Sequence, residues 1–132
     1  MHALVSRVYR LASAELCVLI LGETGTGKEL CAQSIHKLSR RRNNHLITVN
    51  CAALPSGLLS AELFGSERNA YTGAAHRQGL IASANGGTLF LDEIGELSLE
   101  AQAALLRVLE TGELRPLGSD QIKRVNIRLV CA

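Results

Sequence analysis

Short apolar runs alternate with amphipathic stretches along most of the chain. The apolar runs predict strands at residues 17–21, 46–50, 88–91 and 125–131. Helical spacing and turn signals predict helices at residues 27–38, 58–63, 79–84 and 98–109, and a hairpin over residues 112–123. Because strands and helices take turns along the chain, the pattern predicts an α/β fold with a right-handed, mostly parallel sheet flanked by helices.

The same pattern predicts which positions are buried. The strand at residues 17–21 is apolar throughout, which indicates burial on both faces, as in the interior of a parallel sheet. In the helix at residues 27–38, the predicted inner face carries Cys31, Ile35 and Leu38. In the helix that Ser98 is expected to cap, the predicted buried stripe consists of Leu99, Ala103, Leu106 and Leu109.

Composition narrows the class of protein. The chain has 132 residues, of which 47% are hydrophobic and 20% charged, so residues 1–132 are interpreted as part of one globular domain, with no second domain. A formal net charge of +2 gives no electrostatic case for a dedicated nucleic-acid binder, and Arg40-Arg41-Arg42 is interpreted as a solvated loop. No apolar run approaches the ~18 residues of a membrane span.

Both ends of the chain fall inside predicted elements. Met1 lies in a predicted helix, and the chain stops on an apolar strand at Cys131 and Ala132 without a covering helix after it. The sequence is therefore expected to be an excerpt from a longer protein.

The cysteines and histidines give no metal-binding or disulfide pattern. The four cysteines form no C-x-x-C pair and lie in or beside apolar stretches. Since the chain has no secretory signal, they are interpreted as buried, reduced thiols of a cytoplasmic protein. The four histidines lack metal-ligand spacing and are interpreted as surface or capping residues.

The most specific motif follows the first predicted strand. Residues 22–28 fit G-x-x-x-x-G-K between a strand and a helix, as a phosphate-binding loop requires. Backbone N–H groups and the helix N-terminus would hold the phosphates, with Lys28 as a point charge for the β- and γ-phosphates. The motif predicts that ATP, with Mg²⁺, binds at Gly22, Glu23, Thr24, Gly25, Thr26, Gly27, Lys28 and Glu29. Glu29 departs from the general motif, which has a metal-binding Ser or Thr there.

An acidic pair, Asp92-Glu93, ends the third apolar strand. In open α/β sheets, ligands lie at the carboxyl ends of the strands, so Asp92 is predicted to face the phosphate loop and to orient Mg²⁺, directly or through water. Glu93 is predicted to polarise a water that attacks the γ-phosphate. The alternative for this pair is a plain acidic turn.

Together these motifs resemble part of the central AAA+ ATPase domain of sigma-54-dependent bacterial transcriptional activators. The resemblance covers essentially the whole chain and includes Glu29 after Lys28, the segment at residues 62–65 and the second ATP-site signature at residues 79–94. Residues 50–54 resemble another block of that family. This resemblance implies that Asn50 contacts the catalytic Glu93 and couples the nucleotide state to loop movement.

The family's signature loop, Gly-Ala-Phe-Thr-Gly-Ala, corresponds here to Asn69-Ala70-Tyr71-Thr72-Gly73-Ala74. The resemblance implies that Tyr71, Thr72 and Gly73 bind sigma-54. Tyr71 keeps an aromatic ring, and Asn69 tolerates left-handed backbone better than most residues that could replace the first glycine. The hairpin at residues 112–118 resembles the family's second surface loop, which moves with the first.

The resemblance implies an ATPase that remodels the sigma-54 RNA polymerase holoenzyme and so regulates transcription initiation, assembled as a ring, usually a hexamer. The sensor asparagine, the arginine fingers and the DNA-binding domain are expected beyond Ala132, so the isolated chain is predicted to hydrolyse ATP slowly. Asn69 motivates an alternative, a nucleotide-gated interaction module without productive hydrolysis or sigma-54 engagement. Another P-loop ATPase, such as a protein unfoldase, would lack the segment at residues 70–74.

Overall fold

The computed structural model describes residues 15–22, 27–68 and 76–132. Within these residues a parallel sheet has the strand order β1-β6-β3-β2. Its strands are β1 (Val18–Leu19), β2 (Leu46–Asn50), β3 (Thr88–Asp92) and β6 (Arg128–Cys131). An antiparallel hairpin of β4 (Glu113–Leu114) and β5 (Lys123–Arg124) lies outside the sheet. The predicted parallel sheet and hairpin are confirmed, while the predicted helix at Met1 lies outside the described residues.

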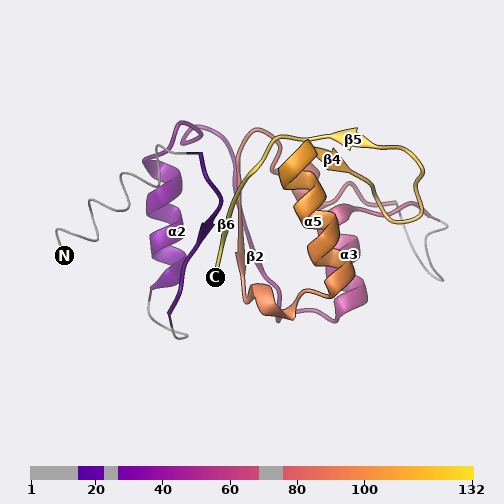
Figure 1. Ribbon diagram of the computed structural model, residues 1–132, viewed down its shortest axis with the longest axis horizontal. Helices are drawn as coiled ribbons and strands as arrows, with labels where there is room; N and C mark the ends of the chain where they lie inside the picture. The colour runs from indigo at the N-terminus through magenta and orange to yellow at the C-terminus, as the bar shows by residue number, and fades with distance from the viewer. Residues whose placement is uncertain (1–14, 23–26, 69–75) are drawn as a thin grey trace.

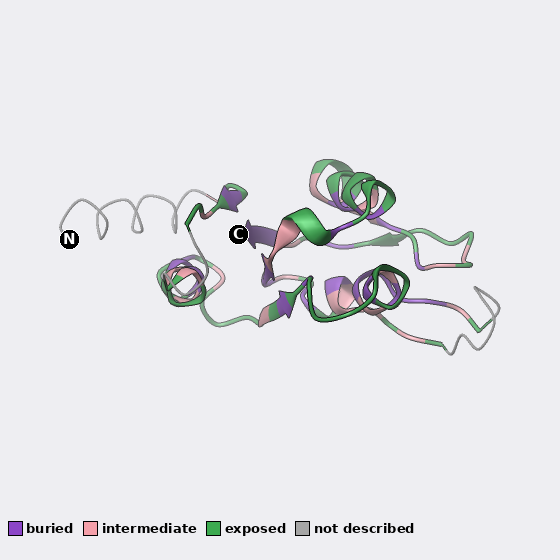
Figure 2. Ribbon diagram, turned by 90° about the horizontal axis from the view of Figure 1, so that it is seen from below, coloured by how far each residue is buried: buried purple, intermediate pink, exposed green. Residues whose placement is uncertain are grey.

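Helices cover both faces of the sheet (Figures 1 and 2). Helix α2 (Lys28–Lys37) lies on one face, while α3 (Ser56–Phe64) and α5 (Leu99–Thr111) lie on the other. Two short helices, α4 (Leu80–Ser83) and the 3-10 helix η1 (Ile94–Glu96), lie before and after β3. This three-layer arrangement is the expected α/β architecture, because each face of a parallel sheet must be covered.

The alternation of side chains along β3 divides the core into two clusters. Phe90 faces α2, where it packs with Ile35 and Val130. Its neighbours Leu89 and Leu91 point to the opposite face, where the larger cluster contains residues of α3 and α5. Both faces of β3 are buried, as the alternation of a strand in the interior of a sheet requires.

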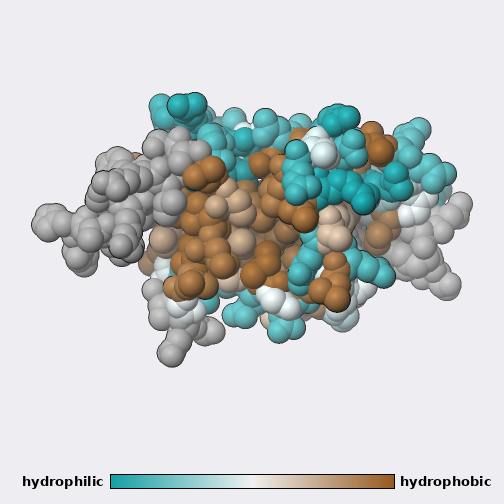
Figure 3. Space-filling model, viewed as in Figure 1, coloured by the Kyte–Doolittle hydropathy of each residue, from teal (hydrophilic) through white to brown (hydrophobic). Residues whose placement is uncertain are grey.

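The first strand is less buried than predicted. Val18 is buried, but Leu19 is 56% exposed, and Leu21 after the strand is 84% exposed. The reason is that β1 pairs with β6 and lies at the edge of the described sheet, so only the side facing α2 is covered. A broad apolar surface is visible in Figure 3 in the region of the strands between α2 and α5.

The inner faces of both long helices also differ from the prediction. In α5 the buried residues are Ala101, Leu105 and Val108, whereas Leu99 is 82% exposed and Leu106 54% exposed. Ser98 does cap this helix, since its Oγ accepts a hydrogen bond from the Ala101 amide at 3.1 Å. In α2 the buried residues are Ala32, Ile35 and His36, while Cys31 is only half-buried and Leu38 is 39% exposed.

His36 is a buried core residue and not a surface or capping residue. Its Nε2 lies 3.0 Å from the Asn44 carbonyl and its Nδ1 lies 2.9 Å from Thr88 Oγ1. Because a carbonyl only accepts, Nε2 donates to Asn44, and in the neutral ring Nδ1 accepts from Thr88. The ring therefore ties the end of α2 to the start of β3.

Arg41 likewise corrects the interpretation of its basic run as a solvated loop. Its guanidinium donates to Glu15 Oε2 at 2.9 Å, to the Gly87 carbonyl at 2.9 Å, and to the backbone and side-chain oxygens of Asn126 at 3.0 and 2.7 Å. The side chain, only 15% exposed, joins the segments that precede β1, β3 and β6. Among the cysteines, Cys51 and Cys131 are buried as predicted, Cys31 is half-buried and Cys17 is exposed.

Candidate functional site

The carboxyl ends of the parallel strands bring the predicted site residues to one edge of the sheet. Gly22 follows β1, Asn50 ends β2 and Asp92 ends β3, while Ala132 follows β6. The register places Asn50 directly opposite Asp92. This is the edge at which open α/β sheets bind ligands, and β1 and β3 are separated there by β6.

The two ends of the phosphate loop lie close together. Gly27 precedes α2 with a φ of 83°, a left-handed conformation that glycine adopts without strain. Lys28 opens the helix, and its Nζ donates to the Gly22 carbonyl at 3.1 Å. Residues 23–26 lie outside the described residues, so the structure places the two ends of the loop and not its middle. Lys28, the first residue of α2, thus brings its ammonium group and the helix N-terminus next to the end of β1.

Asp92 and Glu93 are half-buried, and the backbone turns sharply between them. Asp92 Oδ1 accepts from the Glu93 amide at 2.9 Å. Glu93 has φ 56° and ψ 51°, a left-handed conformation that costs roughly 1–2 kcal/mol for a residue other than glycine. The next amide, of Ile94, donates to the Ala132 carbonyl at 2.9 Å, which fixes this turn to the end of β6.

The acidic pair also affects a thiol in the turn after β2. Burial, followed by the charges of Asp92 and Glu93, raises the pKa of Cys51 to about 11. The Cys51 amide also donates to the Asp92 carbonyl at 2.9 Å, so the two segments are in direct contact.

The donor set fits Mg²⁺, since a carboxylate at a strand end is a preferred ligand of this ion. The described residues contain no group of three or more His, Cys, Asp and Glu side chains that could hold a metal. An ion held by Asp92 beside a nucleotide would take further ligands from phosphate oxygens and water, the usual arrangement for Mg²⁺ bound with a nucleotide.

Asn50 ends β2 with its side chain folded back on its own backbone. Its Oδ1 accepts from the Ala52 amide at 2.9 Å, a local turn typical of asparagine. Within the described residues, no hydrogen bond joins Asn50 to Glu93. The contact that the resemblance implies between these two residues therefore stays a prediction.

The segment predicted to bind sigma-54, with Tyr71, Thr72 and Gly73, lies outside the described residues, but its base is well defined. Ser66 and Arg77 exchange two backbone hydrogen bonds, of 3.0 and 2.8 Å. A Cβ on Gly79 would lie 2.5 Å from the Gly65 amide nitrogen, so only glycine allows the chain segments to approach here. We call residues 65–66 and 77–79 the loop neck.

The hairpin is attached to the loop neck. Leu117, which lies between β4 and β5, donates to the Gly65 carbonyl and accepts from the Glu67 amide, both at 2.9 Å. Sequence reasoning identified the two loops separately but missed the neck glycines. Their signal is only a pair of glycines that flank a polar segment, because the close approach itself is a tertiary contact.

The sheet is parallel, a glycine-rich segment connects its first strand to a helix, and an acidic pair lies at the end of β3, with β6 between the two strands. These features define a P-loop NTPase of AAA+ type. A solved structure of an Escherichia coli protein described as the P-loop NTPase domain of a sigma-54 transport activator has the same fold, with a TM-score of 0.60 and 21% identity over 96% of this chain and 77% of that one. The sigma-54 interaction domain family matches residues 1–132, and the chain belongs to this family.

Several relatives are similar to the chain along its whole length. It is 52% identical to the anaerobic nitric oxide reductase transcription regulator NorR of Vibrio vulnificus, covering 100% of this chain and 26% of NorR. It is 50% identical to the formate hydrogenlyase transcriptional activator FhlA of Escherichia coli K12, covering 100% of this chain and 19% of FhlA. The chain thus spans about a quarter or less of these relatives.

A solved structure of NtrX from Brucella abortus in complex with ATP is also similar. Its TM-score is 0.90, with 33% identity over 99% of this chain and 28% of NtrX. NtrX has also been solved with ADP, at a TM-score of 0.90. Within the described residues of this chain, no helix is long and apolar enough to cross a membrane.

Proposed function

We propose that residues 1–132 form the nucleotide-gripping part of an AAA+ domain whose ATP hydrolysis remodels sigma-54 RNA polymerase and regulates transcription initiation. The observation that carries this proposal is the arrangement at the sheet edge, where Lys28 opens the helix that follows β1, Asp92 ends β3 and Glu93 comes directly after it. The similarity to NtrX solved with ATP supports ATP as the nucleotide.

Binding rests on the loop from Gly22 to Glu29. Backbone amides of the loop and of the first turn of α2 would donate to the phosphates, helped by the positive end of the helix dipole. Lys28 is half-buried beside the loop and would exchange its bond to the Gly22 carbonyl for the β- and γ-phosphates.

Hydrolysis would use the acidic pair. Asp92 would hold Mg²⁺, which supplies charge neutralisation on the phosphates when it is bound. Glu93 would accept a proton from the attacking water, and its left-handed backbone sets the direction in which its carboxylate leaves the strand. A neighbouring subunit's arginine in a ring would contribute on the order of 10³–10⁵ in rate, so the isolated chain is expected to turn over slowly.

A continuous path leads from this site to the loop neck. Asn50 ends β2 opposite Asp92, and α3 begins shortly after it at Ser56. The other end of α3, Phe64, adjoins Gly65 of the loop neck. A small shift at the strand end would therefore be carried by a helix to the base of the segment with Tyr71 and Thr72.

The test uses the full-length protein that contains this chain, with Lys28→Ala, Glu93→Gln and, as a matched control, Lys37→Ala at the exposed end of the same helix. Lys28→Ala should lose ATP binding. Glu93→Gln should keep binding and lose about 10²–10⁴-fold in turnover, the usual contribution of a general base. Lys37→Ala should match wild type. If Lys28→Ala binds ATP as wild type does, the proposed site is wrong.

The second candidate is a nucleotide-gated interaction module that does not engage sigma-54, which Asn69 in the signature loop favours. Promoter opening by the full-length protein separates the two, with Asn69→Gly beside wild type. Normal opening by wild type would rule out the second candidate, whereas opening by Asn69→Gly alone would support it.

A further inference from the structure

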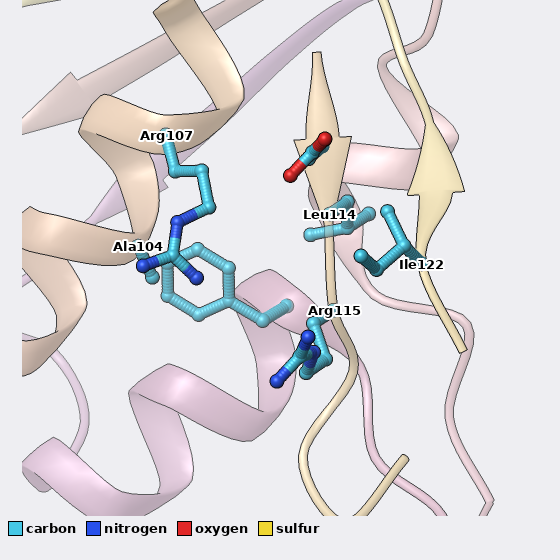
Figure 4. Close-up of a pocket in the computed structure, with 7 residues that line it drawn as sticks. Ala104, Arg107, Leu114, Arg115 and Ile122 are labelled. Atoms are coloured by element: carbon cyan, nitrogen blue, oxygen red, sulfur yellow. The ribbon is translucent and has the colours of Figure 1, made fainter. Parts of the chain in front are cut away.

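A small hollow lies between α5, the hairpin and the end of α3 (Figure 4). Its apolar wall consists of Phe64, Ala104, Leu114 and Ile122. Two arginines reach it from different elements, Arg107 from α5 and Arg115 from the segment after β4, and Figure 4 shows both side chains extending toward the same space.

The two guanidinium groups are not neutralised by neighbours. In the part of the chain that the structure describes, neither Arg107 nor Arg115 donates a side-chain hydrogen bond or forms an ion pair. The one acidic residue at the hollow, Glu113, lies 3.5 Å from Arg124 Nη2 and so already faces another cation. The hollow is therefore positively charged and attracts an anionic group.

The size of the hollow limits what that group is. Its volume is about 40 Å³, far below the ~300–1,000 Å³ of typical small-molecule pockets. A nucleotide or cofactor does not fit, whereas the end of one side chain does. Arginine pairs best with the planar carboxylate, through two parallel N–H···O bonds. Since the walls are apolar, the matching ligand is an Asp or Glu side chain flanked by apolar residues.

The hollow is also directly connected to the loop neck. Phe64 in its wall is bonded along the chain to Gly65, and Arg115 lies two residues before Leu117, whose backbone pairs with Gly65 and Glu67. A partner bound at the loop neck itself would therefore lie close to Arg115 and to the Phe64 wall of the hollow.

We propose that Arg107 and Arg115 together bind a carboxylate on an acidic, apolar-flanked segment of the same sigma-54 partner that contacts the loop at residues 69–74. This inference rests on the proposed function. It adds a second contact, which is electrostatic and directional, to the aromatic contact expected from Tyr71.

The test measures binding of fluorescently labelled, purified sigma-54 to the full-length protein, in the presence of a non-hydrolysable ATP analogue. The variants are Arg107→Gln, Arg115→Glu and Arg115→Lys. The matched control for Arg115→Glu is Arg40→Glu, the same charge change at an exposed position after α2, a helix that covers the opposite face of the sheet from α5 in Figure 1. Retained ATP binding and circular dichroism show that each variant is folded.

Loss of one charge-assisted contact should weaken binding about tenfold or more, for Arg107→Gln and Arg115→Glu alike. Arg115→Lys should also weaken it, because lysine keeps the charge and loses the bidentate geometry. Arg40→Glu should stay within about twofold of wild type, as expected for a rim charge. Replacing the contacted acidic residue of sigma-54 with lysine should restore binding to Arg115→Glu.

Each contrary outcome has a distinct meaning. If wild type binds sigma-54 but the Arg107 and Arg115 variants behave as Arg40→Glu does, the carboxylate site is refuted while the proposed function stands. If the variants lose affinity for promoter DNA to the same extent without sigma-54, the ligand is a phosphate, and the inference is again wrong. Failure of wild type to bind sigma-54 at all would overturn the proposed function and this inference with it.

Discussion

Replacing Gly79 by alanine tests whether the loop neck depends on the close approach of two chain segments. Gly79 has φ 91° and ψ 149°, a conformation that essentially only glycine adopts. An added Cβ would lie 2.5 Å from the Gly65 nitrogen, 2.7 Å from the Phe64 carbonyl carbon and 2.9 Å from the Leu63 oxygen. All three are backbone atoms, so no side-chain rotation relieves the overlap.

The cost of Gly79→Ala follows from two terms. The backbone conformation contributes roughly 1–3 kcal/mol, and forcing an extra methyl group into a packed site contributes roughly 1–3 kcal/mol more. A loss of about 2–6 kcal/mol is a large part of the ~5–15 kcal/mol by which domains are stable. With a slope of about 2 kcal/mol per molar urea, the unfolding midpoint should fall by about 1–3 M.

The measurement is urea unfolding of the 132-residue chain, with Gly57→Ala in α3 as the control. A Cβ at Gly57 meets no atom within 4 Å, so this variant should be unchanged or more stable by about 0.5–1 kcal/mol. Gly65→Ala should be as harmful as Gly79→Ala, and the double variant should cost less than the sum, because both changes separate the same two segments. A Gly79→Ala midpoint equal to that of wild type would refute the argument.

Three further predictions concern other parts of the fold. A hydrogen bond with Cys131 and the charge of Arg128 lower the pKa of the exposed Cys17 to about 7, although burial acts in the opposite direction. Iodoacetamide should therefore label Cys17 well before Cys51 at pH 7, and peptide mass spectrometry measures the two labelling rates. The pKa of the Cys51 thiol is about 11 in the folded state and near 9.0 in the unfolded state. As the pH rises, the thiol therefore loses its proton first in the unfolded state. Stability should therefore fall by up to about 3 kcal/mol from pH 9 to 11, and Cys51→Ala should make the decline in urea midpoint shallower. Arg41→Ala should cost about 2–3 kcal/mol in the same assay, against less than about 0.5 for Arg40→Ala; equal effects would contradict the role given to Arg41.

The errors in the predicted helix faces have a common physical origin. In α5, leucine, alanine and valine occupy so many positions that several stripes satisfy helical spacing equally well. The stripe that is buried, with Ala101, Leu105 and Val108, is selected by the sheet and α3, which periodicity does not contain. The exposure of Leu19 has the same cause, because edge or interior position depends on strand order and not on the strand's own sequence.

For the candidate site, a different reason decides which residues can be predicted from the sequence. The sequence allows a phosphate loop to be predicted because phosphates are held by contiguous backbone and one neighbouring lysine, so the residues expected to bind are neighbours along the chain. The loop neck joins Gly65 to Gly79, and the arginine hollow joins Arg107 to Arg115 across Phe64. Neither leaves a local pattern, since each exists only after α3, α5 and the hairpin have packed together. A phosphate-binding motif can therefore be predicted from a single sequence, whereas the loop neck and the arginine hollow become visible only in the assembled fold.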